Sequence, residues 1–121
     1  MWDITVGGSA IAGDDSRTAA QRELLEELGI DHDFSALRPA LTINFELGFD
    51  DMYVIKKDVE IDKLKLQYEE VQKVKWADQE EINKLLDEGM FIPYHKSLID
   101  LLFYMIDHEG AHTSKDRTAV Q

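Results

Sequence analysis

The feature that most constrains this chain is residues 7–30, GGSAIAGDDSRTAAQRELLEELGI, near its start. A glycine-bearing loop leads into a segment rich in Ala, Leu and Glu, which predicts a helix over residues 17–28. On this helix Glu23, Glu26 and Glu27 share one arc, beside a separate stripe of apolar residues. Carboxylates this close repel one another unless a positive group lies between them. The sequence therefore implies a missing positive partner.

The rest of the chain mixes strand and helix patterns. Apolar and polar residues alternate over residues 41–47, which predicts a strand with one buried face. The residues FDD that follow are expected to turn the chain into a second strand, MYVIKK. The other predicted elements are strands at 2–6 and 71–76, and helices at 78–89 and 94–108. This order predicts an α/β layered domain with a mixed sheet.

Two of these helices have further signals. Asp78, followed three positions later by Glu81, is typical of a helix start. In the last helix, apolar side chains recur at helical spacing and mark the expected buried face: Leu98, Leu101, Leu102 and Met105.

Length and charge limit the classes of protein to which this chain can belong. A chain of 121 residues fits one domain, which we place at residues 1–108, and residues 109–121 have so little to bury that we expect a disordered tail. The net charge of -12 opposes binding to nucleic acids and anionic lipids. No apolar run is long enough to span a membrane, and the first residues lack the basic leader of a secretory signal. With no cysteine in the chain, a cytoplasmic protein is expected.

The stretch from the glycine loop to the end of the acidic helix resembles the Nudix box, the signature of hydrolases that act on nucleoside diphosphates linked to another moiety. The family pattern is Gly, five residues, Glu, seven residues, Arg-Glu, an aliphatic residue, any residue, Glu-Glu, any residue, Gly and an aliphatic residue. Gly8 takes the first position, and Asp14 stands where Glu is usual. The other positions are filled in register by Arg22, Glu23, Leu24, Glu26, Glu27, Gly29 and Ile30.

The resemblance implies an α/β/α sandwich with a mixed central sheet and a divalent metal, Mg²⁺ or Mn²⁺, as cofactor. A diphosphate repels an attacking water unless divalent cations neutralise its oxygens. Magnesium prefers oxygen ligands, which neighbouring carboxylates on a helix supply. The missing positive partner is therefore expected to be a metal ion.

By the same resemblance, Glu26 and Glu27 are the expected metal ligands, together with the backbone carbonyl of Gly8. Glu23 is either a further ligand or the base that takes a proton from the attacking water. A glutamate outside the box completes the site in many relatives, and Glu70, or Glu69 beside it, is the candidate here. The alternative is that these two are ordinary surface acids.

The remaining box residues resemble the structural part of the motif. Arg22 and Asp14 are expected to pair and to tie the loop to the helix, and Gly29 is expected to end the helix. Because Asp14 is one methylene shorter than the usual Glu, this pairing is expected to be longer or bridged by solvent.

The flanking segments WDITVGG, LQYEEVQKVKWADQEEI and GMFIPYHKSLIDLL resemble the bacterial isopentenyl-diphosphate-isomerase-like branch of the family. The expected function is magnesium-dependent hydrolysis of a diphosphate bond in a small-molecule substrate. An isomerase of isopentenyl diphosphate is the less favoured alternative, because related isomerases use a cysteine where this chain has Gly7 and Gly8.

A third reading is a module that does not catalyse. The family's box normally follows two or more strands of the central sheet, whereas only the predicted strand 2–6 precedes it here. We therefore expect upstream strands to be missing, or the chain to pair with a second copy as a homodimer, since an exposed sheet edge is prone to association.

Overall fold

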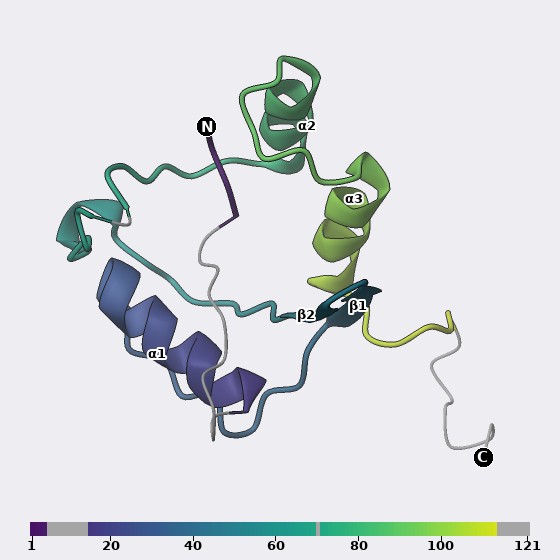
Figure 1. Cartoon of the computed structure of the whole chain (residues 1–121), viewed down its shortest axis with the longest axis horizontal. Helices are drawn as coiled ribbons and strands as arrows, with labels where there is room; N and C mark the ends of the chain where they lie inside the picture. The colour runs from purple at the N-terminus through teal and green to yellow at the C-terminus, as the bar shows by residue number, and fades with distance from the viewer. Residues whose placement is uncertain (5–14, 70, 114–121) are drawn as a thin grey trace.

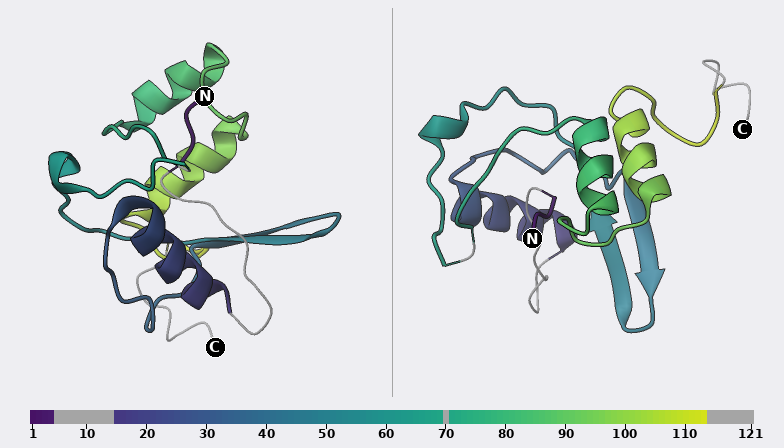
Figure 2. Two further views of the ribbon diagram at one scale, coloured as in Figure 1. Left: turned by 60° about the vertical axis from the view of Figure 1, so that its left-hand side comes forward. Right: turned by 90° about the horizontal axis from the view of Figure 1, so that it is seen from above.

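The computed structural model describes residues 1–4, 15–69 and 71–113. The elements placed there are α1 (Ser16–Leu28), β1 (Leu41–Phe45), β2 (Gly48–Met52), the short 3-10 helix η1 (Ile61–Lys63), α2 (Gln79–Asp87) and α3 (Lys96–Met105). The α2 and α3 helices lie side by side, and α1 lies apart from them (Figures 1 and 2). Within these residues, no helix is both long and apolar enough to cross a bilayer.

The predicted acidic helix is confirmed as α1, with a defined start and end. The Asp15 carboxylate accepts a hydrogen bond of 2.8 Å from the backbone N–H of Thr18, which lowers the pKa of Asp15. At the other end Gly29 takes a left-handed conformation, φ 70°, and its N–H donates to the Leu25 carbonyl at 2.9 Å. The segment after η1 then pairs with the end of α1: the N–H of Lys65 donates to Leu28.

The hydrophobic core lies along one face of α1. Leu24 and Leu28, one turn apart, form a buried cluster with Phe34 from the following loop. Part-buried apolar side chains pack against this cluster: Ala20, Ile30, Leu37, Tyr53, Ile55, Leu66, Val71 and Val74. Phe91 and Ile99 are also buried and lie outside this cluster.

The hairpin exists, but its predicted turn is wrong. Residues 49–51, FDD, lie in β2 rather than in the turn, and the chain reverses between Phe45 and Gly48. The register pairs Thr42 with Asp51, and the Thr42 hydroxyl donates to the Asp51 carboxylate at 2.6 Å, which favours strand pairing over a turn at this aspartate. Only the first residue of MYVIKK belongs to a strand.

The buried face expected for residues 41–47 is also wrong. Phe45 is 53% exposed and Leu47 is 91% exposed. In both views of Figure 2 the hairpin extends beyond the helices, so none of the described elements covers its apolar side chains there.

The central sheet is smaller than predicted. In the part of the chain that the structure describes, β1 and β2 form one antiparallel sheet, and an isolated parallel bridge joins Trp2 to Phe91. Residues 71–76 are not a strand, because their backbone finds no strand partner among the residues described. The helices and small sheet agree with the predicted α/β class. The predicted strand 2–6 and tail 109–121 extend outside the described residues.

Both predicted C-terminal helices are present, as α2 and α3. The Asp78 carboxylate caps α2 by accepting from the backbone N–H of Glu81 at 2.8 Å, as predicted. The α3 helix is shorter than predicted, and its buried face centres on Ile99, 2% exposed, rather than on Leu101, which is 43% exposed. The predicted face is therefore wrong at Leu101, and the most buried side chain of the helix, Ile99, lies outside the predicted stripe.

We predict that Gly29→Ala destabilises the fold more than Gly89→Ala. Both glycines have φ 70°, so alanine costs roughly 1–2 kcal/mol at either position. A Cβ at Gly29 would also lie 2.9 Å from the Lys65 Cβ and 3.2 Å from its backbone nitrogen, whereas a Cβ at Gly89 meets nothing within 4 Å. Urea unfolding should show a loss of unfolding free energy about 1 kcal/mol larger for Gly29→Ala. Equal losses would contradict the close approach of Lys65.

A second prediction concerns the polar contact between α2 and α3. Asp100 accepts hydrogen bonds from Gln79 at 2.7 Å and Asn83 at 3.2 Å, and these hold the pKa of Asp100 below its ordinary 3.8. The folded pKa is depressed, so ionised Asp100 stabilises the fold above pH 3.8, and this stabilisation is lost as the pH falls through the folded pKa.

The urea midpoint of Asp100→Ala should therefore approach that of the unsubstituted chain as the pH is lowered from about 7 to about 2.5. The helix propensity of alanine does not depend on pH, so it cancels in this comparison. Asp58→Ala serves as the exposed control. A midpoint difference that stays constant with pH would show that the charge of Asp100 contributes nothing.

Candidate functional site

The acidic residues of α1 differ in their exposure. Glu27 is 7% exposed, and it is the one charged residue of the described chain that counts as buried. Glu26, next to it, is exposed, and Glu23, one turn earlier, is part-buried. Helical spacing places Glu27 between the core stripe and the acidic arc. The α1 helix thus brings one carboxylate to the boundary of the core and leaves another facing outward.

A guanidinium lies beside this acidic arc. The Arg22 Nη2 atom is 3.6 Å from the Glu23 Oε1 atom, and both side chains are part-buried. This separation gives a loose ion pair that offsets part of the repulsion on the helix. The expected partner of Arg22, Asp14, lies outside the described residues.

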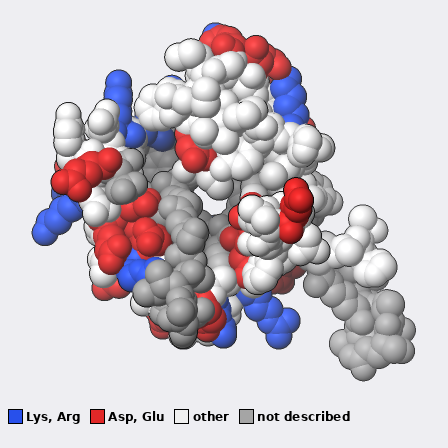
Figure 3. Space-filling view, in the orientation of Figure 1, with Lys and Arg blue, Asp and Glu red and all other residues white. Residues whose placement is uncertain are grey.

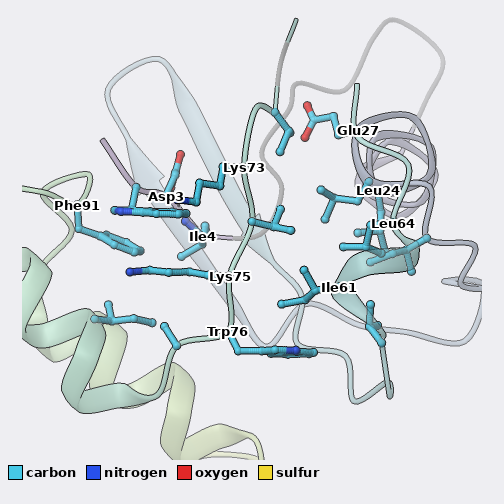
Figure 4. Close-up of a pocket in the computed structure, with 18 of the residues that line it drawn as sticks. Asp3, Ile4, Leu24, Glu27, Ile61, Leu64, Lys73, Lys75, Trp76 and Phe91 are labelled. Carbon is cyan, nitrogen blue, oxygen red and sulfur yellow. Dashed lines mark hydrogen bonds between the residues drawn. The ribbon is translucent and has the colours of Figure 1, made fainter. Parts of the chain in front are cut away.

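The buried glutamate lines a large cavity of about 1170 Å³. Leu24 and Glu27 of α1 lie on one side of it and Phe91 lies on the opposite side (Figure 4). Most of the lining side chains are apolar, and the charged ones are Asp3, Glu27, Lys57, Lys73 and Lys75. The cavity therefore combines a mainly apolar wall with a few charged groups, which is the usual composition of a small-molecule site.

Two lysines of this cavity were missed at the level of sequence. Lys73 and Lys75 project to the same side, toward Asp3 and Phe91 (Figure 4). The Lys75 Nζ atom lies 4.6 Å from the centroid of the Trp2 ring, a cation–π contact. The sequence does contain a signal for them: in residues 73–75, KVK, the two lysines alternate with a valine, which puts both on one side of an extended segment.

A tyrosine near the C-terminal helix forms a hydrogen bond with an aspartate near the start of the chain. The Tyr94 hydroxyl donates to the Asp3 carboxylate at 2.8 Å. Burial, and next this hydrogen bond, raise the pKa of Tyr94 well above its ordinary value. Tyr94 therefore stays protonated at neutral pH and acts as a hydrogen-bond donor, not as a base.

The carboxylate oxygens of the acidic arc on α1 are donors of the kind that a hard divalent cation prefers. Glu23, Glu26 and Glu27 offer only oxygen, which Mg²⁺ and Mn²⁺ prefer. However, the described side chains include no group of three or more His, Asp or Glu that could hold a metal ion by itself. The other expected donors, Gly8 and Glu70, lie outside the described residues, and Glu69 is exposed. The oxygen atoms of the three glutamates are donors of the right kind for such an ion, but the three side chains as placed do not form a group that could hold one.

Charge is unevenly distributed over the surface. Asp and Glu side chains gather on the face over α1 (Figure 3), in a chain whose net charge is -12. Such a face attracts cations and repels phosphate-rich polymers.

Comparison with known proteins identifies the family. The model of the NUDIX domain matches residues 1–101. An uncharacterized Nudix hydrolase of Listeria innocua is 47% identical over 93 residues, covering 77% of this chain and 55% of the relative. One of Listeria monocytogenes is 46% identical with the same coverage. Nudix hydrolase 3 of Arabidopsis thaliana is 35% identical over 110 residues, covering 78% of this chain and 14% of the relative.

The chain spans about half the length of the two Listeria relatives. No solved structure gives a significant match. Members of the family generally use divalent metal ions, in agreement with the acidic arc on α1. The match over residues 1–101 and the box residues on α1 together show that this chain belongs to the Nudix family.

Proposed function

We propose that this chain carries the catalytic residues of a hydrolase that cleaves a diphosphate bond in a nucleoside diphosphate-linked small molecule by attack of water. The observation that carries the proposal is Glu27, a carboxylate buried on α1 at the wall of a cavity. Carboxylates buried at the wall of a cavity are common at functional sites. Family membership supplies the class of reaction.

The proposed cofactor is Mg²⁺ or Mn²⁺. Glu26 and Glu27 would hold it, with the Gly8 carbonyl and Glu70 or Glu69 as further donors. When bound, the metal would neutralise phosphate oxygens and lower the pKa of the attacking water. Glu23 is proposed as a further ligand or as the general base.

The described side chains support this arrangement in other ways. The Arg22 guanidinium, 3.6 Å from the Glu23 carboxylate, restrains the direction of that side chain. Packing of Leu24 and Leu28 in the core fixes the rotation of α1, and with it the position of Glu27. The proposed catalytic domain is residues 1–108.

The cavity suggests how a substrate would be accommodated. Its volume of about 1170 Å³ exceeds that of most small-molecule sites, and its wall is mainly apolar. We propose that the diphosphate lies at the Glu27 end and that the rest of the substrate lies against the apolar wall. The acidic surface supports a small-molecule substrate over a nucleic acid, and the composition supports a cytoplasmic location.

A second candidate is a Nudix module that does not catalyse. One observation favours it: the described side chains alone do not form a metal site. Such a module would fold and still lack turnover.

The test is a substrate panel with glutamine variants. The purified chain, with Mg²⁺ or Mn²⁺, is offered nucleoside triphosphates, ADP-ribose, nucleotide sugars and isopentenyl diphosphate, and both cleavage and isomerisation are followed. Glu26→Gln and Glu27→Gln should each lower the cleavage rate by about 10²-fold or more, because they remove a charged donor. Glu80→Gln, on the exposed face of α2, is the matched control and should leave the rate unchanged.

If Glu27→Gln cleaves a substrate at the same rate as the unsubstituted chain, the proposal that Glu27 is a metal ligand is contradicted. A folded chain that cleaves nothing in the panel would favour the module that does not catalyse.

A further inference from the structure

The charge balance of the cavity is opposite to that of the chain. The sequence has 13 Lys and Arg against 25 Asp and Glu, whereas the charged residues that line the cavity are three lysines and two acids. Lys73 and Lys75 are two of these lysines, and they project to the same side, away from Glu27 (Figure 4). In an acidic protein, two neighbouring ammonium groups in a cavity form a favourable place for an anion.

These two lysines differ in their surroundings from other lysines of the chain. Other lysines lie 2.5–3.9 Å from a carboxylate, namely Lys56, Lys63, Lys84 and Lys96. In the described part of the chain, no ion pair joins Lys73 or Lys75 to an acid. The Asp3 carboxylate, toward which they project, accepts hydrogen bonds from the Tyr94 hydroxyl and the Ile4 N–H, at 2.8 and 2.7 Å. Both ammonium groups can therefore pair with an anion from outside.

Packing on two sides fixes the direction of the lysines. Val74, between them, packs against the buried cluster along α1, so the lysines on either side of it face away from that cluster. The Lys75 Nζ atom lies 4.6 Å from the centroid of the Trp2 ring. The Trp2 backbone is fixed in turn, because its N–H donates to Met90 and its carbonyl accepts from Ile92, both at 2.8 Å. A side chain already held in place loses less conformational entropy when it binds a ligand.

The type of cation favours a phosphate monoester as the anion. Lysine binds phosphate as a compact point charge, whereas arginine forms the paired hydrogen bonds that suit a carboxylate. The described residues that line the cavity include no arginine. A phosphate monoester carries about 1.5 to 2 negative charges at neutral pH, which two lysines match, whereas a carboxylate carries a single charge.

These lysines are separated from the proposed metal site. Glu27 lies on one side of the cavity, and the lysines project toward Phe91 on the opposite side (Figure 4). A mainly apolar wall lies between the two ends. A diphosphate held at the Glu27 end therefore leaves the lysine end to another part of the substrate.

We propose that Lys73 and Lys75 form a subsite for a phosphate monoester, and that the substrate of this chain carries such a group in addition to its diphosphate. The monoester lies at the lysines, the apolar part of the substrate lies against the wall, and the diphosphate lies at the Glu27 end. The statement about the substrate rests on the proposed function, whereas the subsite itself requires no hydrolysis.

The first experiment tests the subsite without metal and without turnover. The ligand is phenyl phosphate, which joins an apolar ring to a phosphate monoester. The signal is the fluorescence of Trp2 in a Trp76→Phe background, since the chain has two tryptophans. Without a divalent ion the acidic Glu27 end repels phosphate, so binding reports on the lysines. Lys73→Ala and Lys75→Ala should each raise the dissociation constant by about fivefold or more, because each removes a charged hydrogen-bond donor.

Matched controls separate the subsite from general effects of charge. Lys84→Ala removes an exposed lysine of α2 that does not line the cavity, and it should leave the dissociation constant unchanged. Lys75→Arg keeps the charge and should bind nearly as well as the unsubstituted chain. Benzoate, with the same ring and a single charge, should bind about fivefold more weakly or worse. Circular dichroism checks that each variant folds.

The second experiment tests the substrate. NADPH and NADH share a diphosphate and differ by one phosphate monoester, as do coenzyme A and dephospho-coenzyme A. With Mg²⁺, the member with the monoester should have a KM about tenfold lower in at least one pair. Lys73→Ala and Lys75→Ala should reduce this difference through KM and leave kcat nearly unchanged, because the lysines lie away from the bond that is cleaved.

The outcomes separate this proposal from the proposed hydrolysis. The subsite is overturned if phenyl phosphate does not bind, if it binds equally well to both alanine variants, or if benzoate binds as tightly. Cleavage with no preference within either pair would overturn the assignment of the substrate. Binding of phenyl phosphate at the lysines by a chain that cleaves nothing would support the subsite and contradict the hydrolysis.

Discussion

The period of one helix couples the core of this molecule to its candidate site. Leu24 and Leu28 lie one turn apart and anchor the core, so Glu27, between them in sequence, is held at the core boundary. A rotation of α1 that exposed Glu27 would also pull the leucines out of the cluster. The free energy that buries the leucines therefore also maintains a buried carboxylate.

The hydrogen bonds at the end of α1 extend this coupling. The backbone N–H of Lys65 donates to Leu28, and that of Gln67 donates to Glu27, at 3.1 and 2.9 Å. The left-handed Gly29 allows residues 65–67 to approach this closely. The segment that follows forms one wall of the cavity and carries Lys73 and Lys75. The box helix thus positions both its own glutamate and the lysine-bearing wall.

Local signals predicted the helices well and the sheet poorly. Asp78 and Gly29 act through neighbours within four residues, so their capping roles could be read from the sequence. The hairpin turn and the fate of residues 71–76 depend on which segments pair, a long-range choice that alternation alone does not fix. Alternation in residues 41–47 indicated a buried face, yet burial needs a covering element, and none of the described ones covers the hairpin.

The candidate site was predictable to a similar extent. The box pattern located the glutamates on one helix, and the family comparison agrees with that reading. The pattern did not show that Glu27 is buried while Glu26 is exposed, because that difference depends on tertiary packing around α1. Lys75 and Trp2 meet across more than 70 residues of sequence, so their contact has no local signal.

The most direct measurement is calorimetric titration of the folded chain with Mg²⁺ and Mn²⁺, alongside Glu27→Gln and Glu80→Gln. If the buried carboxylate of α1 exists to hold a divalent cation, the chain takes up the metal at millimolar concentrations or below. Glu27→Gln should then weaken uptake by roughly tenfold or more, with Glu80→Gln unchanged. A folded chain that takes up neither ion, or one that binds equally well with Glu27→Gln, would contradict this account.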